Sequence, residues 1–175
     1  GSSKKPWTAE WKVTLRGIQR LSATLTAKDG STVCSTLNPF LLVTAPAPEG
    51  SAAGGGSTTI PVAAASSTKV EERQYEAKYA VDGDFFTRWG SDWTDNESIT
   101  LDLGDMHNVS GVTLMWEMAY GKRYVIELSQ DGQSWSKAAE KNDGQGGIEY
   151  IDFTPTKARY VRMRGLGRAT EWGYS

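Results

Sequence analysis

Glu117 and Tyr120 are the polar residues whose placement most suggests chemistry. They follow a strand-like run at 112–116 and precede another at 123–129, where apolar side chains alternate with outward-facing positions. Alternation with a period of two is typical of a strand that has one buried face. Gly121 marks a turn between the runs, and polar side chains on a loop held by a rigid sheet are common binding groups. We therefore expect Glu117 on the rim of a binding site, with Tyr120 in a supporting position.

A second group of oxygen-bearing side chains consists of Asp82, Asp84 and Thr87, with Gly83 between the two carboxylates. Closely spaced carboxylates suit a hard cation such as Ca²⁺, which takes about six to eight oxygen ligands in a flexible geometry. The spacing differs from that of the helix-flanked calcium loop. A plain turn held by Asx hydrogen bonds is therefore an equal alternative on spacing alone.

Catalytic groups are scarce. His107 and Cys34 are the only residues of their kinds, so neither a zinc site nor a Ser-His-Asp arrangement is indicated. Glu71 and Glu117 could form the paired carboxylates of a glycosidase, which lie ~5–10 Å apart. Such enzymes hold their substrate in a deep cleft, which a small β-sandwich rarely provides. We expect no enzymatic activity in this chain.

Composition excludes further classes of partner. The chain has 175 residues, and its 19 basic and 21 acidic side chains give a net charge of -2 without a long run of like charge. This does not suit nucleic acid. No apolar run approaches the ~20 residues of a membrane span. A single cysteine allows no disulfide within the chain.

The elements that must position these groups fall into three parts. Residues 1–45 read as a small β-rich module or the tail of a preceding domain, and 46–59 have the Ala-Pro and Gly-Ser composition of a linker. Residues 60–175 contain many short strand-like runs separated by turn signals, which predict an antiparallel all-β sandwich. These runs lie at 99–103, 109–116, 123–129, 148–153 and 158–164.

Four motifs in 60–175 resemble the discoidin-like (factor 5/8 type C) domain, and they occur in the family's order. Residues 117–120 and the ending 168–175 are further similar to family 32 carbohydrate-binding modules of bacterial chitosanases and glucanases. The resemblance implies a galactose-binding-domain-like jelly roll with ligand-binding loops at one end. The four motifs are AVDGDFFTRW at 80–89, ITLDLG at 99–104, SQDGQSW at 129–135 and ARYVR at 158–162.

The resemblance also implies a function and a setting. We expect a non-catalytic module, secreted or on a bacterial cell surface, that is monomeric within a multidomain enzyme. It would target a parent glycoside hydrolase to a polysaccharide, namely chitosan or another glucosamine polymer, or an α- or β-glucan. The alternative is a discoidin-like adhesion domain that binds a protein or a membrane surface. Acidic residues in the corresponding loops argue against anionic lipid.

Carried over position by position, the family pattern identifies the groups around the binding end. Arg88 offers fixed donors, although it could instead pair with Asp84 or Asp92, and Trp93 could instead be a core residue. Trp89, Trp116 and Trp135 are assigned to the core. The resemblance also implies structural calcium at Asp82, Asp84 and Thr87. The expected carbohydrate-binding residues are Glu71, Arg88, Trp93, Glu117, Tyr120 and Trp172.

One departure from the family pattern concerns the last strand. Family members continue past the Gly-Tyr-Ser segment at 173–175 into a final strand that this sequence does not contain. An unpaired sheet edge is an aggregation hazard. Either the last strand is truncated in this sequence, or another segment fills the gap, for which residues 10–17 have suitable alternation. We favour a tail from a preceding module for this part of the chain.

Overall fold

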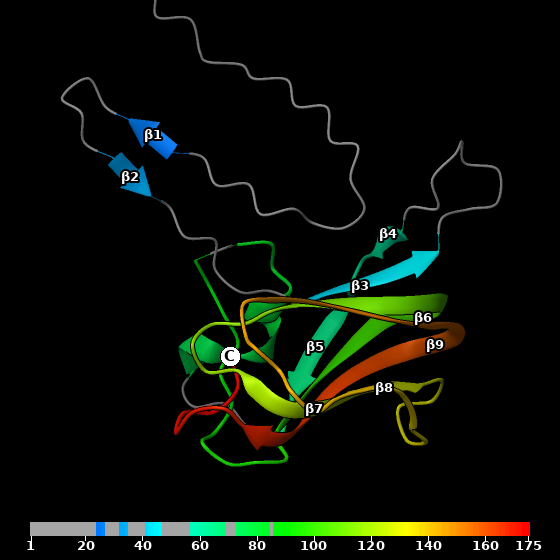
Figure 1. Ribbon diagram of the computed structural model, residues 1–175. Coiled ribbons are helices and arrows are strands. Elements are labelled where there is room, and N and C mark those ends of the chain that lie inside the picture. The colour runs from blue at the N-terminus through cyan, green and yellow to red at the C-terminus, as the bar shows by residue number, and fades with distance from the viewer. Residues whose placement is uncertain (1–23, 27–31, 35–40, 47–56, 69–72, 85) are drawn as a thin grey trace, which may run out of the picture.

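The computed structural model describes residues 24–26, 32–34, 41–46, 57–68, 73–84 and 86–175 (Figure 1). Helix in these ranges is confined to two short 3-10 turns, η1 (Arg73–Tyr75) and η2 (Ala77–Ala80). Neither has the length or apolar character that crossing a membrane requires. The remaining regular structure is β-strand, which confirms the expected all-β class.

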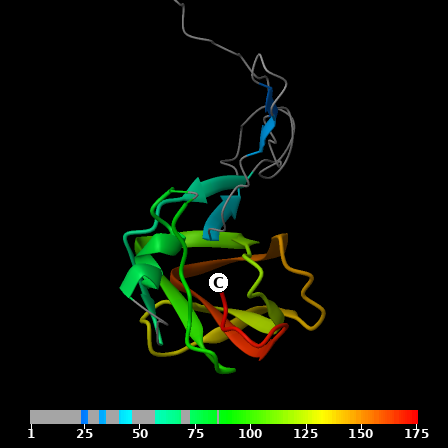
Figure 2. The ribbon, with the colours of Figure 1, turned by 90° about the vertical axis from the view of Figure 1, so that its left-hand side faces the viewer.

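A seven-stranded sheet forms the domain, with the order β4-β3-β6-β9-β7-β8 and with β5 paired to β6. The pairs are antiparallel, and the sheet curves so that its parts face each other across a core (Figures 1 and 2). Its strands are β3 (Leu41–Pro46), β4 (Ser57–Ile60), β5 (Ala64–Ser67), β6 (Ser98–Met115), β7 (Gly121–Ser129), β8 (Ser136–Lys141) and β9 (Ile148–Arg168).

The long strand β6 pairs with β9 along one edge and with both β3 and β5 along the other. A register shift between Asp102 and His107 separates a first half, which pairs with β5, from a second half, which pairs with β3. Gly104 lies in this irregular stretch at a φ of 82°, a conformation that favours glycine. The bulge changes the strand's direction without ending it, as bulges commonly do. Strand β6 then leads directly to Trp116 and Glu117.

Alternating side chains of β6, β7 and β9 fill the core. Leu101 and Val161 are almost fully buried, and each such side chain stabilises the fold by roughly 1.5–3 kcal/mol. Trp89 and Trp116 are buried as expected. Trp135 was wrongly assigned to the core. It is only half-buried, and the guanidinium of Arg162 stacks 4.0 Å from its ring.

Strands β3 and β4 overlap the two ends of the expected linker at 46–59 and belong to the same sheet as the later strands. They pair with each other, and β3 pairs with β6 from Leu41↔Leu114 to Thr44↔Gly111. Two further short strands, β1 (Thr24–Thr26) and β2 (Thr32–Cys34), form a separate pair. Residues 10–17, the strand candidate named above, lie outside the described residues. The expected division at 45 and 60 stays a prediction.

Candidate binding site

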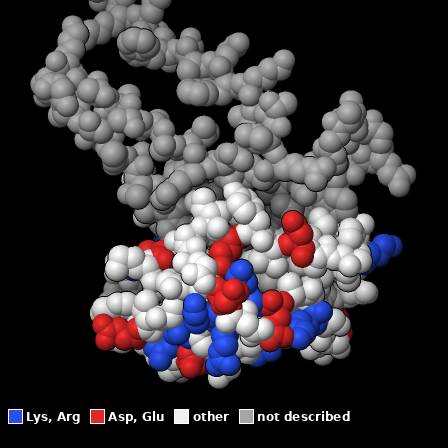
Figure 3. Space-filling view, viewed as in Figure 1, with Lys and Arg blue, Asp and Glu red and all other residues white. Residues whose placement is uncertain are grey.

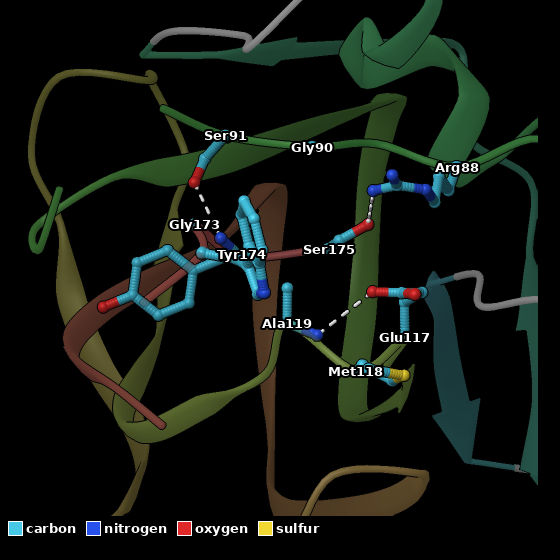
Figure 4. Close-up of a pocket in the computed structure, with 10 residues that line it drawn as sticks. Arg88, Gly90, Ser91, Glu117, Met118, Ala119, Gly173, Tyr174 and Ser175 are labelled. Atoms are coloured by element: carbon cyan, nitrogen blue, oxygen red, sulfur yellow. Dashed lines mark hydrogen bonds between the residues drawn. The ribbon is translucent and has the colours of Figure 1, made fainter. Parts of the chain in front are cut away.

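A pocket of about 340 Å³ opens where three irregular segments meet (Figure 4). The segments are the loop after the 3-10 turns, the loop between β6 and β7, and the stretch that follows β9. All three are held by the sheet but are not part of it. The residues that line the pocket are Arg88, Gly90, Ser91, Glu117, Met118, Ala119, Trp172, Gly173, Tyr174 and Ser175.

Backbone hydrogen bonds fasten the stretch after β9 between the other two segments. On one side, the Ser91 amide donates to the carbonyl of Tyr174 at 2.9 Å, and the Tyr174 amide donates to Ser91 Oγ at 2.8 Å. On the other side, the Ser175 amide donates to the carbonyl of Ala119 at 2.7 Å, and the Glu117 amide donates to the carbonyl of Ser175 at 3.0 Å. The pocket wall is therefore built like a short strand pairing on both edges.

Gly173 allows the stretch after β9 to lie close to the backbone of Ser91 and Asp92. A Cβ at this position would lie 2.5 Å from the carbonyl oxygen of Ser91 and 2.6 Å from that of Asp92. Both are backbone atoms that cannot move aside without breaking the pairing. Tyr174, the next residue, is fully buried, and this burial raises its pKa to about 12. The wall is thus fixed from within the core.

Arg88 is held in place on two sides. Its Nη1 donates to Ser175 Oγ at 2.6 Å, and its guanidinium carbon lies 4.1 Å from the centre of the Tyr75 ring. Ser175 Oγ in turn donates to the carbonyl of Trp89 at 2.6 Å. A guanidinium has five N–H donors. Because only one of them is used in these contacts, Arg88 retains donors that can serve a ligand.

Glu117 lies along the same wall of the pocket, with Ser175 between it and Arg88 (Figure 4). Its Oε2 accepts the Ala119 amide at 3.1 Å, which holds the carboxylate at the start of the loop. A carboxylate can accept about four hydrogen bonds. Glu117 therefore keeps acceptor capacity facing the pocket, next to the exposed side chain of Met118.

The two predicted aromatic groups lie against each other. Trp93 and Trp172 are 49% and 45% exposed, and their rings form an edge-to-face pair with centroids 4.9 Å apart. The alternative that placed Trp93 in the core is wrong. Exposed indoles of this kind offer flat apolar faces next to the pocket.

Two other predicted residues are placed differently. Tyr120 packs against the core cluster and does not line the pocket. Its carbonyl accepts the Ala169 amide at 3.0 Å, so it holds the stretch after β9 from behind. Glu71 lies outside the described residues. The structure thus groups Arg88, Glu117 and Trp172 in one pocket, with Trp93 beside it.

Sequence reasoning missed the residues that build the pocket wall. Ser91, Gly173, Tyr174 and Ser175 act through backbone contacts in irregular segments, and such contacts leave no periodic pattern in a sequence. Tyr75 was missed because its ring packs against the guanidinium of Arg88, a contact that follows from the fold and not from a local sequence pattern. A glycine that follows a predicted binding tryptophan was the one available signal, because it often marks a close backbone approach.

The expected calcium loop is a compact turn closed by its own hydrogen bonds. Asp82 Oδ1 accepts the Asp84 amide at 2.9 Å, and Asp82 Oδ2 accepts the Thr87 hydroxyl at 2.7 Å. Asp84 Oδ1 accepts the Phe86 amide at 2.8 Å. Nowhere in the described ranges do three or more His, Cys, Asp or Glu side chains gather as metal ligands. The turn alternative fits these contacts, and calcium stays a prediction.

The chain is similar to solved carbohydrate-binding modules. Chitosan-binding module 1 of a chitosanase/glucanase from Paenibacillus sp. IK-5 is 36% identical, with a TM-score of 0.62 over 66% of this chain and 89% of that one. Module 2 of the same enzyme, solved in complex with chitotriose, is 34% identical, with a TM-score of 0.62 over 66% of this chain and 91% of that one. A family 32 module from Clostridium perfringens, in complex with GalNAc-β-1,3-galactose, is 25% identical, with a TM-score of 0.57 over 63% and 89%.

A curated relative places a similar segment inside a much larger protein. A polysaccharide lyase 8 family protein of Enterococcus faecalis is 35% identical over 96 residues, which are 53% of this chain and 7% of that protein. The chain therefore spans a small part of this relative. Residues 62–175 match the F5/8 type C domain family. Since this range is more than half of the sequence, the chain belongs to the F5/8 type C domain family.

Proposed function

We propose that this chain is a non-catalytic carbohydrate-binding module that targets a parent glycoside hydrolase to a polysaccharide containing glucosamine. The observation that carries the proposal is the pocket itself. It joins a carboxylate from Glu117, a guanidinium from Arg88 and the exposed indole of Trp172 within about 340 Å³.

Each of these groups suits a different part of an amino sugar. An indole face packs against the apolar face of a pyranose ring. The guanidinium of Arg88 donates hydrogen bonds to hydroxyl oxygens. Glu117 accepts hydrogen bonds from hydroxyl groups and would attract a protonated amine by ~1–4 kcal/mol at dielectric constants between that of water and that of a protein surface. The similarity to chitosan-binding modules supports the same class of ligand.

The pocket is suited to binding rather than to hydrolysis. Among the described residues that line it, Glu117 is the only carboxylate, whereas glycoside hydrolysis generally uses a pair. The two similar modules of the Paenibacillus enzyme are chitosan-binding modules. Catalysis is therefore assigned to a separate domain of the parent enzyme.

The setting follows from the ligand. Polysaccharides of this class are met outside the cell, so we place the protein in a secreted or cell-surface enzyme. A shallow site that contacts a few sugar rings gives modest affinity by itself. Retention on an insoluble polymer would then come from several linked modules that act together, because the second contact is made at high effective concentration.

A binding assay on insoluble polymers tests the proposal. The native chain is incubated with chitosan, α-glucan and β-glucan, and a soluble glucosamine trimer is titrated with tryptophan fluorescence as the signal. We expect retention on chitosan, and Trp172→Ala should abolish it. Trp135→Ala removes a half-buried tryptophan outside the pocket and serves as the matched control. A folded native chain that binds none of the three polymers would refute the proposal.

A further inference from the structure

The tryptophan pair beside the pocket is carried by two loops that have no regular structure of their own. Trp93 lies in the stretch that precedes β6, and Trp172 lies in the stretch that follows β9. Their rings are nevertheless held at 87° to each other. Half-exposed side chains on irregular loops need a specific restraint to keep such a geometry.

Arg168, the last residue of β9, contacts both loops. Its backbone amide and its Nε both donate to Asp95 Oδ1 at 3.1 Å, two residues beyond Trp93. Its Nη1 donates to the carbonyl of Glu171 at 2.8 Å and to that of Trp172 at 3.4 Å. One side chain at a strand end therefore ties the loop of Trp93 to the loop of Trp172. The hydrogen bond from the Arg168 amide lowers the pKa of Asp95, and the hydrogen bond from the Arg168 side chain lowers it further. The Asp95 carboxylate is therefore ionised at neutral pH.

We propose that Arg168 and Asp95 act as a clamp, which positions Trp93 and Trp172 as a second contact area for a sugar chain that extends out of the pocket. This inference rests on the proposed function. Both clamp residues are positioning residues, because they act through the indoles and not on the ligand. The clamp fixes the rings before binding, so that less conformational freedom is lost when a ligand arrives.

The clamp should matter more for long ligands than for a single sugar ring. Trp172 lines the pocket but Trp93 does not. A single sugar ring in the pocket therefore has no contact with Trp93, whereas a chain that continues over Trp172 reaches it. A change in the clamp should therefore weaken the binding of an oligomer, which meets both indoles, more than that of a monomer, which meets Trp172 alone.

The chain offers a matched control for the charge and geometry of the clamp. Arg159 Nε and Nη2 donate to the two oxygens of Asp102, each at 2.8 Å. This pair joins β9 to β6, and Asp102 Oδ1 also accepts the Gly104 amide at 2.8 Å, so its hydrogen bonds lie within these two strands and not in the loops of the two tryptophans. Removing its charge tests the loss of a surface ion pair without any change in the aromatic pair.

The experiment compares Arg168→Gln and Asp95→Asn with Asp102→Asn. The first measurement needs no ligand: neighbouring indoles give a coupled far-ultraviolet circular dichroism signal, which Trp93→Phe assigns to this pair. We expect both clamp variants to lose this signal and Asp102→Asn to keep it. The second measurement is the affinity for glucosamine and for its trimer. Clamp variants should bind the trimer roughly fivefold to tenfold more weakly, the size of one lost aromatic contact, and should lose clearly less affinity for the monomer, which meets Trp172 but not Trp93.

Two results would overturn the inference. An unchanged dichroism signal in both clamp variants would show that other contacts hold the rings. Equal losses for monomer and trimer would show that the clamp supports the pocket as a whole. If the native chain bound neither sugar, the proposed function and the second contact area would both fail. The dichroism signal would still decide whether the clamp exists.

Discussion

Glu117 and Glu149 are two carboxylates next to Trp116 that have very different surroundings. Glu149 is buried, and its Oε2 accepts the indole N–H of Trp116 at 2.8 Å and the hydroxyl of Tyr124 at 2.7 Å. Its Oε1 accepts the Gln145 amide at 3.2 Å. Glu117 accepts one hydrogen bond, from the Ala119 amide, and faces the pocket.

The difference separates a structural acid from a binding acid. The acceptor oxygens of Glu149 are occupied by groups of the fold. Burial, and after it the hydrogen bond to Glu149, raises the pKa of the Tyr124 hydroxyl far above its usual value. The Glu149 partner Trp116 belongs to the core and directly precedes Glu117. One carboxylate therefore fixes the end of β6, from which the other is presented to a ligand.

Removing the structural acid should have the largest effect. Glu149→Ala leaves the indole N–H of Trp116 and the hydroxyl of Tyr124 buried without an acceptor. We expect the free energy of unfolding, measured by urea denaturation, to fall by about 2–4 kcal/mol. The folded fraction should still bind the glucosamine trimer within about threefold of the native chain. This range allows for an indirect loss of binding free energy of somewhat more than about half a kcal/mol. A loss of binding without a loss of stability would reverse the two roles.

The binding acid should show the opposite pattern. Glu117→Gln keeps the shape and one acceptor oxygen but removes the charge. Affinity for the glucosamine trimer, measured by calorimetry, should fall about tenfold, or ~1.4 kcal/mol, while binding of a neutral glucan oligomer is spared. Stability should change by less than about 0.5 kcal/mol. Equal losses for charged and neutral sugars would mean that the carboxylate meets a hydroxyl group and not an ammonium.

Tyr124→Phe tests how much of the Glu149 network a single hydrogen bond supplies. The ring still packs against Trp116, whose centroid is 5.5 Å away, so the loss is confined to the hydroxyl. We expect a destabilisation of about 1 kcal/mol in urea denaturation. Tyr150→Phe is the control and should cost less stability than Tyr124→Phe, because water can replace a hydrogen-bond partner at an exposed side chain. Equal effects of the two changes would argue against a special role for the buried pair.

The carboxylates of Asp82 and Asp84 are intermediate between Glu149 and Glu117, since they are exposed but are hydrogen-bonded within their own turn. If it binds calcium, as the family resemblance predicts, chelation should lower the melting temperature by about 2–4 °C, equivalent to ~1 kcal/mol for a chain of this size. Asp82→Asn should remove the response. A melting temperature that chelation does not change would count against calcium here.

The sequence allowed the strands to be recognised but not their continuity. Turn signals at Gly104-Asp105 and Thr154-Pro155 predicted separate runs, whereas β6 and β9 continue through both. A bulge absorbs the irregular residues without ending the hydrogen-bonded ladder, and its effect depends on the partner strand. Strand β8 was missed because its sequence, SKAAEK, has the composition of a solvated segment.

In the candidate site, too, some features could be predicted from the sequence and others could not. Glu117, Arg88 and the two exposed tryptophans could be named from residue types and from the family resemblance. The contacts that orient them, such as Ser175 on Arg88 and Arg168 on Asp95, join residues about seventy or more positions apart. Such pairings follow from the tertiary fold, and no local pattern in one sequence specifies them.

The pairing of β3 with β6 has a consequence for anyone who wishes to move this domain into another protein. The family range begins at residue 62, but the hydrogen bonds of β6 at Gly111–Leu114 are completed by β3. A fusion that started at residue 62 would leave this edge open to other chains, with a risk of self-association. The practical boundary for transplanting the domain therefore lies before Leu41.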